Sequence, residues 1–109
     1  MPVDYSGQDL RGRDFSGQDL TGANLISADL TNAILSYANL TGADLTDANL
    51  RGANLRGAIL SYAILTNADF TNTDLTDAVR RPGISRTDMK GATGLDTVKG
   101  LDTVKGLIG

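Results

Sequence analysis

The chain has 109 residues and a formal net charge of −3, and this length fits a single domain. It contains no Cys and no His, which excludes a disulfide framework and any metal site built on those two residue types. No apolar stretch approaches ~18 residues, so the sequence predicts no membrane-spanning segment.

Charge is distributed unevenly along the chain. Residues 1–79 hold ten Asp and four Arg, a net charge of −6. Residues 80–109 hold three Asp and six Lys or Arg, a net charge of +3. An acidic body followed by a basic segment predicts two parts with different surroundings.

Residues 3–79 repeat with a period of five. A large apolar residue recurs at every fifth position from Tyr5 to Leu75, and Ala precedes most of them by two positions. This period fits neither an α-helix, with 3.6 residues per turn, nor an uninterrupted strand, with a period of two. A turn after every short extended segment resolves the mismatch, because it keeps Leu and Ala inside. Gly, Asn and Asp at the corners supply the positive φ that a type II turn requires.

Two units show the pattern clearly: Ala43-Asp44-Leu45-Thr46-Asp47 and Ala53-Asn54-Leu55-Arg56-Gly57. In this pattern residues 3–79 resemble the pentapeptide-repeat proteins. The resemblance implies an all-β fold, a right-handed quadrilateral β-helix with four units per coil and about four coils. That family is abundant in cyanobacteria and plastids. The compartment therefore stays open between the cytoplasm and, if a leader was removed, the periplasm or thylakoid lumen.

Residues 3–22 are predicted to form an N-terminal capping coil. The Ala position of these four units holds Val3, Gln8, Arg13 and Gln18. The end of a solenoid faces water and needs polar cover, which favours simple capping. The alternative is a docking face. We expect a monomer, with an end-to-end dimer through this open coil as the alternative.

Stacking at twenty-residue intervals predicts four outward columns of residues that precede the central Leu or Phe. The most acidic column contains Asp9, Asp29 and Asp69 around Asn49. Some members of the family imitate DNA with acidic ladders and bind DNA gyrase. The resemblance therefore implies an alternative function, an acidic DNA-mimic binder or inhibitor of gyrase. Arg11 and Arg51 on the same side oppose this reading.

An apolar unit is duplicated within the body. Residues 33–38 and 58–63 share the sequence Ala-Ile-Leu-Ser-Tyr-Ala. Because Tyr tolerates positive φ poorly, a different turn is predicted at Tyr37 and Tyr62. Exposed apolar clusters often mark binding sites. Three readings stay open for this patch: it binds a partner, it is covered by the C-terminal segment, or it has no function. The candidate partner-binding patch consists of Tyr37, Ile59, Tyr62, Ile64 and Val79.

Residues 80–109 are predicted to form a basic C-terminal capping segment. Arg80 replaces the next expected Leu, and Pro82 and Gly83 end the regular coil. Residues 94–99 then repeat as 100–105, and the Asp of each copy is predicted to cap a short helix. A short helical or irregular cap should cover the last coil with apolar residues drawn from Leu95, Val98, Leu101 and Leu107.

The sequence offers little catalytic chemistry. General acid–base and nucleophilic sites most often use His or Cys, and neither is present. In Asp pairs such as Asp44 and Asp47, one residue is predicted to point outward and the other to lie at a corner. We therefore predict a non-enzymatic scaffold or protein-interaction module without a cofactor. Its partner is expected to be a protein rather than a nucleic acid or a membrane.

Overall fold

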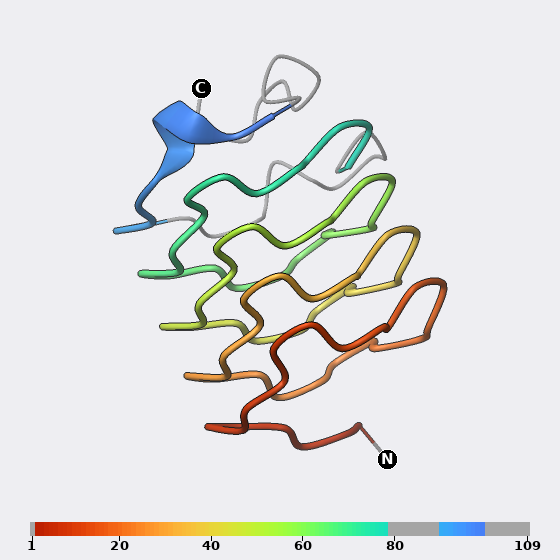
Figure 1. The fold of residues 1–109 in the computed structure, drawn as a ribbon. Coiled ribbons are helices and arrows are strands. Elements are labelled where there is room, and N and C mark those ends of the chain that lie inside the picture. The colour runs from red at the N-terminus through yellow and green to blue at the C-terminus, as the bar shows by residue number, and fades with distance from the viewer. Residues whose placement is uncertain (1, 79–89, 100–109) are drawn as a thin grey trace.

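The structure, a computed structural model, describes residues 2–78 and 90–99. The chain winds into coils stacked one above the next, with the N-terminal coil at the bottom of Figure 1 and residues 90–99 at the top. Parallel bridges join residues twenty apart, for example Asp4 to Asn24 and Asn24 to Asp44. Since the sequence repeats every five residues, each coil has four sides, as the sequence predicts.

We number the sides from the N-terminus and keep these names below. In the first coil the sides are 3–7, 8–12, 13–17 and 18–22, and each later coil adds twenty to these numbers. Each bridge is isolated, so residues 2–78 and 90–99 contain no extended strand or sheet and no α-helix. Within these ranges the single regular helix is the 3₁₀ turn η2 (Leu95–Thr97).

The core is a stack of Leu and Phe surrounded by Ala. Leu45 and Leu50 are fully buried, and so is Ala43 in the same coil. Burying one Leu side chain contributes roughly 1.5–3 kcal/mol, so the stack replaces a few large aromatic contacts with many aliphatic ones. Backbone hydrogen bonds tie neighbouring coils together: Leu25 N–H donates to the Asp44 carbonyl at 2.8 Å, and Asp44 N–H donates to the Ala23 carbonyl at 2.9 Å.

The corners use one turn throughout. At a typical corner, Ala43 N–H donates to the Leu40 carbonyl at 2.9 Å, and Gly42 between them has φ 69°. Positive φ at the third turn residue is the type II pattern that the sequence predicts. The prediction of a different turn at the tyrosine corners is wrong, because Tyr37 and Tyr62 both have φ 60°. The neighbouring coils impose the corner conformation even where the side chain disfavours it.

In the N-terminal coil, two aromatic rings pack together and a charged side chain lies over them. The Tyr5 and Phe15 rings meet edge to face with centroids 5.7 Å apart. The Arg13 guanidinium lies over both rings, 5.8 Å from the centroid of Tyr5 and 5.7 Å from that of Phe15. Arg13 stands at the position that Ala occupies in most later units.

Residues 90–99 add part of a fifth layer above the second and third sides. Thr93 bridges Asp69 and Lys99 bridges Asp74, so the spacing rises from twenty residues to 24 and 25. Leu95 and Val98 are half-buried against the core, as expected. Leu101 and Leu107, and most of the degenerate unit at 87–91, lie outside the described residues.

The expectation that Asp96 caps a helix is wrong. The residue before η2 is Gly94 in the left-handed conformation, with φ 76°, and no side chain caps the turn. The Thr97 hydroxyl instead donates to the Gly94 carbonyl at 2.7 Å. A Cβ at position 94 would come within 2.5 Å of the Thr71 backbone nitrogen, so close approach to the coil below requires glycine there. Asp102, the equivalent residue of the second copy, lies outside the described residues.

Candidate interaction surface

Over the first three coils, the fourth side carries almost no charge. In the first three coils it comprises residues 18–22, 38–42 and 58–62, and its one charged residue is Asp19. Each of the other three sides holds at least three charged residues over the same coils. Its outward residue changes from Asp19 through Asn39 to Ile59, so the surface becomes less polar towards the C-terminal end.

Two tyrosines flank this side at its corners. Tyr37, at the corner between the third and fourth sides, is 69% exposed, and Tyr62, at the corner leading to the next coil, is 59% exposed. Ile64 on the first side is also exposed, whereas Ile59 is half-buried. The sequence had not singled out Ile34, which is exposed on the third side three residues before Tyr37. Ile34 occupies the same position in the first copy of the duplicated unit as Ile59 does in the second, and this correspondence could have identified it. Val79 lies outside the described residues.

Tyr37 lies against a glycine of the next coil. A Cβ at Gly57 would come within 2.5 Å of the Tyr37 Cε1 atom, so the ring covers the bare backbone at that corner. Tyr37 N–H also donates to the Arg56 carbonyl at 2.8 Å. The left-handed conformation costs a non-glycine residue roughly 1–2 kcal/mol. The contact with Gly57 offsets part of that strain.

Outward Asp and Asn residues hold the corners through a side-chain hydrogen bond that sequence reasoning missed. Asp44 Oδ1 accepts from the Thr46 backbone N–H at 3.0 Å and from the Thr46 hydroxyl at 2.6 Å. The same bonds recur on all four sides, for example between Asp19 and Thr21. The recurrence of Asp or Asn two positions before Ser or Thr was the available signal.

Three outward positions among the described coils lack this acceptor, because they hold Ile34, Ile59 and Ile64. An isoleucine side chain accepts no hydrogen bond, so each of these units gives up the local support that its neighbours have. Ile34 and Ile64 also expose apolar surface. Departures from a locally consistent pattern are expected at functional sites, so these three positions are candidates for a functional role.

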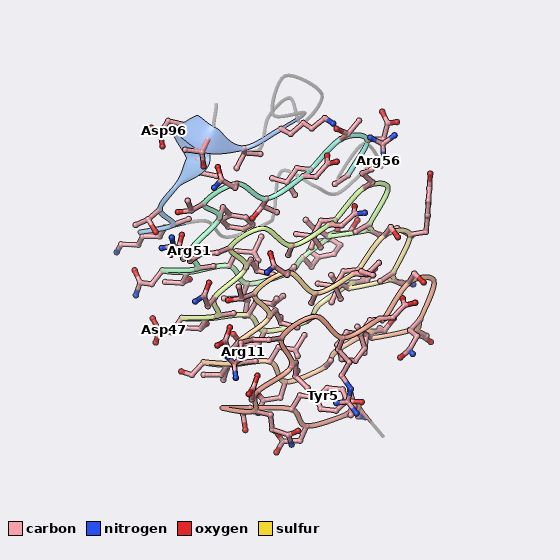
Figure 2. The ribbon with its side chains drawn as sticks, viewed as in Figure 1. Tyr5, Arg11, Asp47, Arg51, Arg56 and Asp96 are labelled. Atoms are coloured by element: carbon pink, nitrogen blue, oxygen red, sulfur yellow. The ribbon has the colours of Figure 1, made fainter. Side chains whose placement is uncertain are left out.

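The acidic column on the second side is paired with arginine. The Arg11 guanidinium lies 2.7 Å from the Asp9 carboxylate and 3.8 Å from that of Asp29. Arg51 lies 3.6 Å from Asp69 on the same side. Figure 2 shows Arg11 and Arg51 one above the other along the stack. Arg11 and Arg51 therefore lie on the same side as the acidic column, as the sequence predicts.

Hydrogen bonds on this side stabilise the carboxylates in their charged form. The Arg11 side chain, followed by its backbone N–H, lowers the pKa of Asp9 to about 2. The pKa of Asp69 is lowered first by the Thr71 hydroxyl and then by the Thr71 N–H. Asp9 and Arg11 also line a shallow depression with Gly12, Thr31 and Asn32. The column is therefore a mixed ion-pair ladder rather than a row of unpaired negative charges.

Other chemistry is sparse in the described part of the chain. Residues 2–78 and 90–99 hold no group of three or more Asp that could bind a metal ion. Asp44 points outward in the bridge ladder, and Asp47 occupies a corner with φ 61°, as the sequence predicts. Within the same ranges no helix is both long enough and apolar enough to cross a membrane.

Comparisons with known proteins agree with this architecture. The family model for pentapeptide repeats matches residues 6–36 and 38–77 in eight copies. The chain is similar to the pentapeptide repeat protein Rfr23 from the cyanobacterium Cyanothece 51142, with 32% identity, 91% of this chain covered and a TM-score of 0.83. It spans 65% of the length of that protein.

A second similar structure is alr5209, a pentapeptide repeat protein from Nostoc Pcc 7120. It is 28% identical, with 90% of this chain and 84% of that chain covered and a TM-score of 0.69. No curated protein sequence matches significantly. These neighbours imply a right-handed quadrilateral β-helix, within which the described residues form isolated bridges.

Proposed function

Because the chain belongs to the pentapeptide-repeat family, we propose that it is a non-enzymatic scaffold or interaction module that binds a protein partner through its fourth side. The surface is defined by Tyr37, Ile59, Tyr62 and Ile64, together with Ile34 at its margin. Val79 is included in the proposed surface only because of its position in the sequence.

The observation that carries the proposal is the combination of missing charge and exposed tyrosine on one side. The cores of protein interfaces are depleted in charged residues and enriched in Tyr. Tyr is also frequent among the residues that contribute most to binding. The other three sides carry Asp and Arg at comparable positions.

Local stability gives a second reason. Tyr37 and Tyr62 occupy left-handed corners that Gly or Asn fills with less strain, and Ile34, Ile59 and Ile64 replace the corner-supporting Asp or Asn. Each change weakens its own unit, and all five lie on or beside one face. Selection for a binding surface explains why these costs are concentrated there.

The test compares three forms of the tagged full chain in a pull-down from the source organism's lysate. The forms are wild type, a patch variant with Tyr37→Ser, Ile59→Asp and Tyr62→Ser, and a control variant on the second side with Asn32→Ser, Asn49→Asp and Asn72→Ser. The control changes one outward and two corner residues, as the patch variant does. Circular dichroism must show that all three are folded.

A partner should be captured by wild type and by the control and lost by the patch variant, and should rebind when purified. Capture that survives in the patch variant would contradict the assigned surface. Loss in both variants would mean that the binding site is not confined to the fourth side.

The alternative function is an acidic imitation of DNA that inhibits gyrase through Asp9, Asp29 and Asp69. Pairing with Arg11 and Arg51 weakens this alternative, since a DNA duplex presents unpaired negative charge along its length. A supercoiling assay separates the two functions. Inhibition that is lost when Asp9, Asp29 and Asp69 are replaced by Asn would favour gyrase binding and count against the interaction module.

We also propose a division of the chain into a repeat body, residues 3–79, and a basic capping segment, residues 80–109. Residues 3–22 act as the N-terminal capping coil of a monomer. The Arg13 contacts with Tyr5 and Phe15 support the first cap. The half-buried positions of Leu95 and Val98 support the second.

A further inference from the structure

Three side chains form a row across the fourth side of the third coil. Ile59 is the outward residue of this side, and Tyr62 occupies the corner that ends it. Tyr37 belongs to the coil below, but its ring lies against Gly57, the corner from which this side begins. Two exposed tyrosines therefore flank Ile59 at the level of one coil.

The backbone beneath this row is hydrogen-bonded along the stack. Ile59 N–H donates to the Ala38 carbonyl at 3.0 Å, and the Ile59 carbonyl accepts from Leu40 N–H at 2.8 Å. The Ser61 carbonyl accepts from Gly42 N–H at 2.9 Å. Strand addition needs an open sheet edge, whereas these groups already join neighbouring coils. A ligand must therefore bind the row through side chains.

The row is long and narrow. Residues 57–62 span at most about 16 Å, at ~3.3 Å per residue. One coil is ~4.8 Å high, whereas an α-helix is about 10–12 Å in diameter. A polyproline II helix rises about 3.1 Å per residue, so four to six of its residues match the length of the row. These dimensions favour a slender extended ligand.

The chemistry of the row also suits a proline-rich segment. Over the first three coils the fourth side has one charged residue, Asp19, two coils below Ile59. The tyrosine hydroxyls can donate hydrogen bonds. Asn39, bridged below Ile59, accepts from Thr41 N–H through Oδ1 at 3.0 Å, which leaves its Nδ2 group as a further donor. Proline-rich segments offer carbonyl acceptors and few N–H donors, so the two sets of groups are complementary.

We infer that Tyr37, Ile59 and Tyr62 bind a proline-rich segment in the polyproline II conformation. The two tyrosine rings contact prolines three residues apart, which lie about 9 Å from each other on one face of the ligand. Aromatic surfaces recognise such segments with little loss of conformational entropy, because the ligand is already extended. A surface smaller than the ~800 Å² of a standard interface can therefore bind one. The inference rests on the proposed function and names the part of the partner that makes contact.

The test titrates the ¹⁵N-labelled full chain with an unlabelled, acetylated proline decapeptide and follows the backbone amide signals. A Gly-Ser decapeptide is the flexible control. Tyr37→Asn and Tyr62→Asn remove the rings one at a time, and Asn already occupies a left-handed corner at Asn32. Ser27→Asn is the matched control at a corner that does not flank the fourth side. Circular dichroism must show that each variant is folded.

The proline peptide should shift the amide signals of residues 37–42 and 57–62 with a Kd on the order of 0.1 mM, because the contact is smaller than a standard interface. Each Tyr→Asn substitution should weaken binding about tenfold, since Tyr is frequent among the strongest contacts. Tyr62→Phe keeps the ring and should weaken binding less than Tyr62→Asn. Ser27→Asn should leave the affinity unchanged.

Equal shifts with the Gly-Ser peptide, or equal affinity in wild type and both Tyr→Asn variants, would overturn the inference. The pull-down separates this failure from failure of the proposed function. Excess proline peptide should release a partner that wild type captures and the patch variant loses. Such a partner, if it stays bound in the presence of the peptide, would refute the proline-rich ligand while the interaction module stands. Peptide binding without any captured partner would support the row and count against the proposed function.

Discussion

Asp and Asn residues before the central leucines support the corners that follow them. Asp44 accepts two hydrogen bonds from Thr46, one from the backbone and one from the hydroxyl. A backbone N–H left without an acceptor at a corner costs free energy comparable to a lost hydrogen bond. The frequent Asp in the body therefore has a structural role that is separate from net charge.

Asp44 provides the first prediction, because no ion pair complicates its role among the described contacts. Asp44→Ala should lower the free energy of unfolding by about 1 kcal/mol, the usual net value of such a hydrogen bond. Asp44→Asn keeps the acceptor oxygen and should stay within about 0.5 kcal/mol of wild type. Urea unfolding measures both. Equal losses in the two variants would show that the carboxylate charge, rather than the acceptor, is what matters.

Glycine at position 57 leaves room for the Tyr37 ring. Gly57→Ala places a methyl group in that space, whereas Gly42→Ala at the matched φ of 69° meets nothing within 4 Å. Both substitutions destabilise the fold by roughly 1 kcal/mol, because Ala is strained in the left-handed conformation. Gly57→Ala should cost about 1 kcal/mol more than Gly42→Ala, since the ring must move away from the backbone.

A double-mutant cycle isolates the contact between the two residues. In a Tyr37→Asn background the ring is absent, so Gly57→Ala and Gly42→Ala should then have the same effect on the free energy of unfolding. A difference that persists without the ring would place its cause in the backbone of Gly57. Stacking at twenty-residue intervals places Gly57 directly above Tyr37, so the sequence already indicated that these two residues meet, and the structure confirms it.

Each five-residue unit is stable only when a neighbouring coil covers it. Isolated bridges, one per side, join the layers, so a layer contributes mainly through its contacts with those above and below. The partial fifth layer supplies these contacts at the C-terminal end through Thr93 and Lys99. The end of the core therefore depends on Leu95 and Val98.

Leu95→Ala with Val98→Ala should loosen the fourth coil before the rest of the body. The two side chains are only half-buried, so the expected loss is about 1–2 kcal/mol, less than for a fully buried pair. Amide hydrogen exchange should accelerate in residues 63–78 and change little in residues 23–42, because repeat proteins lose structure locally. Uniform acceleration over both ranges would contradict this local coupling.

The strict five-residue period predicted the register, the four sides and the buried Leu and Ala positions, because every unit gives the same signal. Prediction was weaker where that period ends. At Asp96 the local capping preference was overruled by close packing of Gly94 on Thr71. At Tyr37 the backbone preference of a bulky residue was overruled by the coil. In both cases a tertiary contact outweighed a local tendency.

Below neutral pH, the titration of the whole molecule should come mainly from its Asp carboxylates. The chain has no His and no Cys, so few groups change charge between about pH 5 and pH 8. All four outward Asp residues of the first coil have a lowered pKa, as do two in the fourth coil. Hydrogen bonds from the residue two positions later contribute to the lowering in every case.

A carboxylate whose pKa is lower in the folded chain binds fewer protons there than in the unfolded chain. Stability therefore rises with pH through the interval between the two values, about 2 for folded Asp9 and ~3.9 for an unfolded Asp. Stability should be constant from about pH 5 to pH 8 and decline as the pH falls from about 4 towards 2. Thermal unfolding across this range measures it.

Replacing Asp14 and Asp19 by Asn shows how much these two carboxylates contribute to acid unfolding, compared with the other groups that titrate at low pH. Asn keeps the acceptor oxygen for Ser16 and Thr21 but does not titrate, so the decline below about pH 4 should become shallower. The melting temperature above about pH 5 should change little, because the corner hydrogen bonds are retained. An unchanged acid profile would mean that other groups control acid unfolding, and that the first coil unfolds independently of the charge state of its outward residues.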